Sequence, residues 1–258
     1  MKLSIRSELD YVLPERCDVL LQVEAAIIPE QKVVSAHIDL PGTEHFARVP
    51  GHDTIGDRIW LRHGGDLTVT YTAEVEIERL SADISQLSAV PPHQLPGETI
   101  QYILPSRFCP SDRFQTLAED EFGHLDGGAK ITAIRDWIHQ HVDYAPGSSN
   151  AETGAMQTYI DRAGVCRDFA HLVITLARAS TIPARFVSVY GLGVTPEDFH
   201  AVAEVFLDGT WYLVDATGMS SSDRMAKIGV GRDAADVSFL TSYGAAHMRS
   251  QSVEVREA

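Results

Sequence analysis

The sequence predicts an α+β protein with two regions, and three observations support this prediction. In residues 1–80, Val, Ile, Leu and Thr recur with the two-residue period of β-strands. Residues 81–97 end in the proline-rich segment Pro91–Gly97, which cannot hold a regular element and is typical of a linker. In residues 98–258 the apolar pattern first has a helical period and then returns to a period of two.

The first region, residues 1–80, is expected to form a small all-β sandwich or barrel. Its strand-like runs are separated by turn pairs such as Pro41-Gly42 and Gly64-Gly65, and the clearest alternation extends from Thr68 to Ile77. Several strands with short connections and no helical pattern bury their apolar faces best by packing on one another. The region contains no chemical motif, and its histidines lack the close spacing of metal ligands.

Helices are expected at the start of the second region, where apolar residues recur at helical spacing. The expected helices cover residues 112–122, 129–142, 155–162 and 168–180. Ser111 and Asp112 can cap the first of them. The last follows a break at Gly164 and stops before Pro183, because the residue that precedes a proline disfavours helical geometry.

Strands are expected again after the last helix. The period of two returns in residues 185–191, 200–207 and 210–216. Asp208-Gly209, between the second and third of these runs, is a strong signal for a hairpin turn. The tail is expected to contain a turn or short helix at 237–243 and a last strand at 247–255.

Cys166 is the candidate nucleophile. It follows the glycine break and stands at the start of the long apolar helix, where unpaired N–H groups and the helix dipole stabilise negative charge. Because the thiolate is the reactive form of cysteine, this position favours reactivity. Taken alone, Cys166 could also be a small buried side chain that only packs.

His200 and Asp215 are the candidate general base and orienting acid that a catalytic thiol needs. If Asp208-Gly209 forms a two-residue turn, Asp215 lies opposite Val202, on the face that His200 also occupies. The two side chains would then be diagonal neighbours within reach of each other. A cysteine at a helix start, a histidine on a strand and an acid on the next strand together favour catalysis over three separate structural roles.

Two other polar side chains near Cys166 are weaker candidates. His171 follows the cysteine by five residues, whereas side chains that face each other on a helix are three or four apart. Asp168 lies in the first turn, where it is expected to accept backbone N–H groups or to pair with Arg167.

Four segments of the second region carry a resemblance to a known superfamily. They are Gly164–Leu172, Ile182–Arg185, His200–Val205 and Trp211–Thr217. In these segments the sequence resembles the core of the transglutaminase-like superfamily. More narrowly, it is similar to a bacterial branch that is described as candidate cysteine proteases and carries a β-rich N-terminal domain. Residues 104–112 and 231–237 are also similar to that branch.

This resemblance implies a papain-like α+β core, in which the nucleophile helix packs on an antiparallel sheet that carries the histidine and the acid. It implies that Cys166 is the nucleophile, that His200 acts as general base and acid, and that Asp215 orients His200. The chain shows no acidic cluster with the spacing of a calcium loop, so we expect neither a metal nor another cofactor.

An oxyanion site is also expected, because acyl transfer passes through a negatively charged intermediate. The backbone N–H of Cys166 would be the first donor. Tyr144, Gln157 and Tyr159 are the candidates for the second donor and for substrate contacts, and each could equally serve packing or the surface.

The expected function is thiol-dependent acyl transfer on a peptide or a glutamine-type amide. Hydrolysis, as in a cysteine protease or amidase, is preferred on family analogy alone. Transfer to an amine or deamidation, as in a protein-glutamine transglutaminase, is the alternative. An alternative of another class is a non-catalytic peptide-binding module on the same fold.

Composition and charge restrict the partners. The formal net charge of −15 disfavours binding to nucleic acid and to an anionic membrane surface. The expected partner is a peptide or protein substrate, and the sequence makes no prediction of an oligomeric state. The three cysteines suggest neither a disulfide framework nor a zinc site, and no signal peptide or membrane span is apparent, so a cytoplasmic location is expected.

Overall fold

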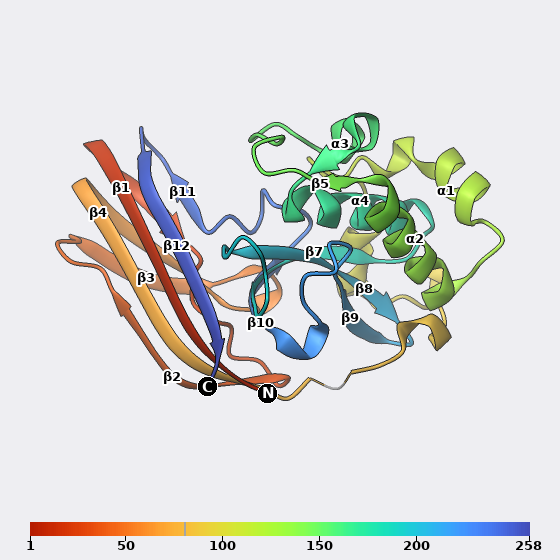
Figure 1. Cartoon of the computed structure of the whole chain (residues 1–258), viewed down its shortest axis with the longest axis horizontal. Helices are drawn as coiled ribbons and strands as arrows, with labels where there is room; N and C mark the ends of the chain where they lie inside the picture. The colour runs from red at the N-terminus through yellow and green to blue at the C-terminus, as the bar shows by residue number, and fades with distance from the viewer. Residues whose placement is uncertain (80) are drawn as a thin grey trace.

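Two antiparallel sheets, a two-stranded parallel sheet and a group of helices are found in residues 1–79 and 81–258, which the computed structural model describes (Figure 1). The larger sheet has six strands, and its centre is formed by two long paired strands, β1 (Lys2–Leu21) and β4 (Asp57–Ile77). Four shorter strands complete it: β2 (Gln31–Asp39) and β3 (His45–Pro50) beside β4, and β11 (Leu240–Ser242) and β12 (His247–Glu257) beside β1.

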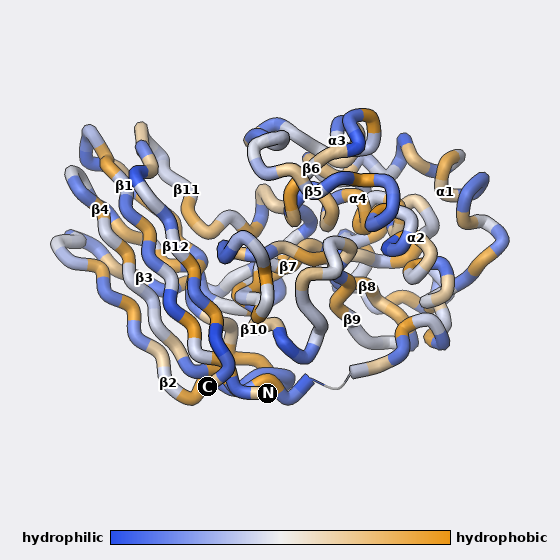
Figure 2. The backbone as a smooth tube through the Cα atoms, viewed as in Figure 1, coloured by the Kyte–Doolittle hydropathy of each residue, from blue (hydrophilic) through white to orange (hydrophobic). Residues whose placement is uncertain are grey.

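The larger sheet has one apolar face because β1 and β4 bury every second side chain along most of their length. Figure 2 shows the resulting alternation of polar and apolar residues along both strands. The apolar face packs against Tyr190, Phe199 and Ile228, which all come from the second region of the chain. The second region therefore supplies the cover that the N-terminal strands need.

The structure corrects one expectation about the N-terminal region and one about the tail. The region is rich in strands, as predicted, but within the described residues β1 to β4 join one sheet instead of a sandwich. The tail joins the same sheet through β11 and β12. Residues 240–242 form a strand and not the turn or short helix predicted for 237–243. Leu80, the last residue of the predicted first region, lies outside the described residues.

The smaller sheet has four antiparallel strands in the order β10-β7-β8-β9. They are β7 (Ala184–Gly191), β8 (His200–Leu207), β9 (Thr210–Val214) and β10 (Met225–Gly231). The first three lie where the sequence predicts strands. The fourth carried no prediction, because every residue of β10 is buried and its sequence shows no alternation.

Helices cover one face of the smaller sheet (Figure 1). They are α1 (Gln115–Phe122), α2 (Gly127–His141), α3 (Ala155–Asp161) and α4 (Cys166–Ala179). All four predicted helices are present. Helix α4 packs on β7 and β8, and its residues 168–178 are all buried. It is therefore the centre of the second hydrophobic core, which lies between the helices and the smaller sheet. Among the described residues, no helix is long and apolar enough to cross a membrane.

The predicted linker, residues 81–97, lies against the second core over part of its length. The carbonyl of Leu87 accepts the N–H of Gly128, and the carbonyl of Ser88 accepts the N–H of Asp208. Short 3-10 helices occur here and elsewhere: His52–Thr54, Ile84–Gln86, Pro92–Gln94, Gly97–Tyr102, Ser111–Arg113 and Ser222–Arg224. The division of the chain at 81–97 into two independent domains stays a prediction.

Candidate active site

Cys166 is the first residue of α4, and the structure explains why the helix begins there. Val165 is the N-cap residue, and Oδ2 of Asp168 accepts its backbone N–H at 2.9 Å. Asp168 is fully buried, so its carboxylate has the structural role predicted for it. A Cβ atom on Gly164 would lie 2.7 Å from Cβ of Asp168, so only glycine permits this close approach.

A short parallel pair of strands brings a tyrosine to the start of α4. Strand β5 (Asp143–Tyr144) pairs with β6 (Ala163–Gly164), which ends two residues before Cys166. The Tyr144 phenol interacts with the backbone and the thiol of Cys166. Burial first, and then the proximity of the cysteine, raises the pKa of Tyr144 to about 12. The phenol therefore remains a proton donor at neutral pH.

The predicted hairpin register is confirmed. Leu207 pairs with Thr210, and Ala203 pairs with Val214, so Asp215 follows the end of β9 directly. Nε2 of His200, on the first residue of β8, lies 2.9 Å from Oδ2 of Asp215. Both side chains are almost fully buried, with 0% and 5% exposure, so solvent competes little with this contact.

His200 also interacts with the Cys166 thiol, whose Sγ lies 4.0 Å from the carbonyl oxygen of Phe199. Because Asp215 occupies Nε2, the ring nitrogen available to the thiol is Nδ1. That atom is buried and has no hydrogen-bond partner among the described residues. Burial lowers the pKa of His200, but the hydrogen bonds and charges of Asp215 and Cys166 outweigh it and raise the pKa to about 9.

Asp215 is held by three donors besides His200. Its Oδ1 accepts the backbone N–H of Thr217 at 2.8 Å and the hydroxyl of Thr217 at 2.6 Å. Its Oδ2 also accepts the N–H of Ser220 at 3.2 Å. Burial raises the pKa of Asp215, but His200 and the two hydrogen bonds from Thr217 outweigh it, so the pKa is lowered. We did not predict Thr217 and Ser220, although the Asp-x-Thr spacing of an Asx-turn could have indicated Thr217.

The other two candidates for oxyanion donor or substrate contact lie elsewhere. Gln157 is exposed on α3, and its Nε2 donates to Oδ2 of Asp161 at 2.7 Å. The Tyr159 ring stacks on Trp137 with centroids 6.0 Å apart, and the Arg162 guanidinium lies 4.4 Å from its centroid. Of the three candidates, Tyr144 is the one whose side chain meets Cys166.

His171 is a core histidine. Its Nε2 accepts the N–H of Ala234 at 3.2 Å, and its ring stacks on Phe108. Burial, followed by the nearby arginines, lowers its pKa well below the usual value, so the ring is neutral. These contacts agree with the sequence interpretation that His171 is a weak candidate for the base.

The two further segments of the resemblance, 104–112 and 231–237, contact each other beside α4. Oδ2 of buried Asp233 accepts the N–H of Phe108 at 2.9 Å. The buried Arg178 guanidinium, on the last turn of α4, donates to the carbonyls of Leu104 and Arg232. These segments therefore contact the nucleophile helix, in part through Arg178 at its last turn.

Comparison with known proteins agrees with this architecture. Residues 116–216 match the model of the transglutaminase-like superfamily, a range that includes Cys166, His200 and Asp215. A protein from Cytophaga hutchinsonii, which is described as a candidate cysteine protease and whose crystal structure is known, is 34% identical to this chain. The alignment covers 99% of this chain and 90% of that chain, with a TM-score of 0.91.

Two mycobacterial relatives are uncharacterized proteins. The one from Mycobacterium leprae is 26% identical over 237 residues, which cover 84% of each chain. The one from Mycobacterium tuberculosis is 34% identical over 126 residues, 42% of this chain and 40% of that protein. Because the Cytophaga relative shares a third of its residues over nearly the whole length of both chains, this chain belongs to the transglutaminase-like superfamily.

Proposed function

We propose that this protein is a cysteine enzyme that cleaves amide bonds of peptides or proteins through Cys166, His200 and Asp215. One observation carries the proposal: Nε2 of His200 contacts the carboxylate of Asp215, the ring also interacts with the Cys166 thiol, and its other nitrogen has no hydrogen-bond partner in the described residues. A buried imidazole in this position can accept the thiol proton and return it to a leaving group.

The first half of the proposed reaction forms a thioester. Proton transfer from Sγ of Cys166 to His200 gives a thiolate and an imidazolium, which the start of α4 and Asp215 stabilise respectively. The thiolate attacks the carbonyl carbon, and the amide π electrons move to its oxygen. That oxyanion receives hydrogen bonds from the Cys166 N–H and, we propose, from the Tyr144 hydroxyl. When the C–N bond breaks, His200 donates its proton to the departing amine.

The second half returns the enzyme to its starting state. Water loses a proton to His200 as it attacks the thioester, and the second tetrahedral intermediate expels the Cys166 thiolate with a carboxylic acid as product. We favour hydrolysis because the Cytophaga relative, similar over nearly the whole chain, is named a candidate cysteine protease. If an amine takes the place of water, the same site performs transamidation, and on a glutamine side chain hydrolysis amounts to deamidation.

Mass spectrometry of the intact protein tests the proposal. After incubation with a peptide library, we expect a trapped acyl adduct on Cys166 in wild type and none in Cys166→Ala. Loss of the adduct with added amine, together with an amine-tagged peptide, would indicate transamidation. Cys17 and Cys109 are buried and serve as internal controls for non-specific acylation.

Alkylation by iodoacetamide distinguishes the enzyme from a non-catalytic peptide-binding module. We expect Cys166 to react faster than a free thiol in wild type and more slowly in His200→Ala. A rate equal to that of a free thiol in both proteins would refute the proposed activation of Cys166. All three cysteines are unpaired, so we propose a reducing compartment, the cytoplasm, as the site of this chemistry.

A further inference from the structure

The loop between β7 and β8 ends beside the thiol. Its last residue, Phe199, contributes the carbonyl that lies 4.0 Å from Sγ of Cys166, and Asp198 directly precedes it. Asp198 is exposed, and its negative charge contributes to the raised pKa of the Tyr144 phenol. The Asp198 carboxylate therefore lies at the rim of the candidate active site, on the side of Tyr144.

The carboxylate of Asp198 is held in place by one of its two oxygens. Oδ1 accepts the backbone N–H of Phe199 at 2.7 Å and also accepts the side-chain amide of Gln251 on β12. Oδ2 accepts no hydrogen bond within residues 1–79 and 81–258. The orientation of the side chain is thus determined by neutral donors, and one oxygen is left for a ligand.

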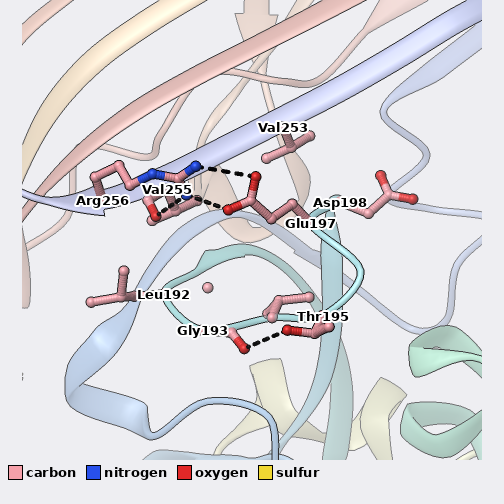
Figure 3. A pocket seen from close by; sticks show the side chains of 10 residues that line it. Leu192, Gly193, Thr195, Glu197, Asp198, Val253, Val255 and Arg256 are labelled. Carbon is pink, nitrogen blue, oxygen red and sulfur yellow. Dashed lines mark hydrogen bonds and ion pairs between the residues drawn. The ribbon is translucent and has the colours of Figure 1, made fainter.

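The neighbouring acid, Glu197, has a different environment. Its carboxylate pairs with the guanidinium of Arg256 on β12, and both side chains line a cavity of about 230 Å³ between the loop and that strand. Figure 3 shows Glu197 turned toward Arg256 and Asp198 turned the other way. In the part of the chain that the structure describes, Asp198 has no ion-pair partner, so its charge is not neutralised as that of Glu197 is.

We propose that Asp198 determines substrate specificity by pairing with a cationic group, an ammonium or guanidinium, close to the scissile carbonyl. The inference rests on the proposed reaction at Cys166 and names the class of substrate for it: peptides with a positive charge beside the reacting amide. That charge can come from a Lys or Arg side chain or from a free α-ammonium group. A held, unpaired carboxylate gives a charge-assisted hydrogen bond to either.

Methanethiosulfonate reagents of three charges test this proposal on the thiol itself. The attacking thiolate forms a mixed disulfide with the reagent sulfur, and methanesulfinate leaves. The measurement is the second-order rate constant at Cys166 for a cationic, a neutral and an anionic reagent. We expect Asp198→Asn to lower the cation-to-anion rate ratio about 10-fold, equivalent to one charge-assisted contact of about 1.4 kcal/mol, and to leave the neutral rate within about twofold.

Two further variants separate specificity from structure. Glu197→Gln is the matched control and should leave the rate ratio within about twofold, because Glu197 already pairs with Arg256. Asp198→Lys should reverse the preference toward the anionic reagent, which a purely structural role of Asp198 would not do. The charge effect should weaken at about 1 M salt, where the Debye length is about 3 Å. An unchanged ratio in Asp198→Asn overturns the proposal.

Peptide aldehydes then identify the source of the charge. We would compare inhibitors with Lys, Arg or norleucine beside the aldehyde, each with a free and an acetylated N-terminus, by their protection of Cys166 from the neutral reagent. A Lys or Arg preference that Asp198→Asn removes indicates the side chain, and a preference for the free N-terminus that it removes indicates the α-ammonium. If wild type shows neither preference, the proposal fails. The rate ratio remains measurable even if Cys166 reacts as an ordinary thiol, so failure of the proposed reaction is distinguishable.

Discussion

Nε2 of His200 lies 2.9 Å from Oδ2 of Asp215, and both side chains are removed from solvent. With Nε2 engaged, Nδ1 is the nitrogen left for Cys166. Asp215 therefore determines which tautomer of the His200 imidazole faces the Cys166 thiol. It also determines how strongly the ring holds its proton.

Asp215→Asn should impair the reactivity of Cys166 more than it impairs folding. An asparagine amide can donate to Nε2, which would place the imidazole proton on Nδ1 and remove the base from the thiol. By comparison with this change in other triads, we expect the rate of acylation to fall about 10³-fold or more. Stopped-flow acylation of the variant measures this, with circular dichroism as the control for folding. A rate within a factor of about ten of wild type would contradict the orienting role.

The stability of the protein should depend on pH through His200. Its pKa is raised to about 9 in the folded protein from an ordinary value of 6.5. A raised pKa means that the folded state binds the proton more tightly, so this stabilisation is complete below pH 6.5 and is lost as pH rises through about 9. Urea unfolding of wild type and His200→Gln between pH 6 and 10 should show the difference in free energy shrinking with pH. A difference that grows with pH would show that the folded protein does not bind the His200 proton more tightly than the unfolded chain.

Tyr144→Phe should slow acylation, because it removes the hydroxyl beside Cys166 and keeps the ring. Loss of one oxyanion donor costs about 10²- to 10³-fold in rate. Gln157→Ala and Tyr159→Phe are matched controls, since neither side chain shares a hydrogen bond with Cys166 in the described residues. Single-turnover kinetics on all three variants identify the donor. Equal rates for Tyr144→Phe and wild type would exclude Tyr144.

Thr217→Val should loosen Asp215 without changing the size of the side chain. The substitution removes the hydroxyl that donates to Oδ1 at 2.6 Å and leaves the backbone N–H in place. We expect the rate of acylation to fall about 10-fold, which is the lower end of the effect of losing a supporting hydrogen bond. The positioning role also predicts a lower apparent pKa for His200 in the pH–rate profile, and Thr217→Ser should restore both. An unaltered pH–rate profile would show that the Thr217 hydroxyl has only a structural role.

Gly164→Ala should displace the start of α4. The new Cβ would lie 2.7 Å from Cβ of buried Asp168, so the cap on Val165 must shift. Such overpacking costs about 1–3 kcal/mol in the free energy of unfolding. Gly97→Ala is the control, because a Cβ there meets nothing within 4 Å. Urea denaturation compares the two variants, and equal stability would show that the helix start tolerates the added methyl group.

The sequence by itself was sufficient for the helix and the hairpin that carry Cys166, His200 and Asp215. The start of the nucleophile helix follows from Gly164 and the apolar pattern after Cys166, and the register of β8 and β9 follows from the two-residue turn at Asp208-Gly209. Both are local signals, because capping and tight turns depend on residues a few positions apart. The pairing of His200 with Asp215 could be predicted from that register, since strand geometry alone determines which side chains are neighbours.

Only the tertiary structure decided which distant segments meet. It brought Tyr144 to Cys166 through a pair of two-residue strands that no periodicity could reveal, and it separated Gln157 and Tyr159 from them. It also returned the tail to β1, which links β12 to the loop that carries Asp198. These contacts join residues far apart in the chain. They depend on which apolar faces cover each other, and local sequence preferences do not determine that.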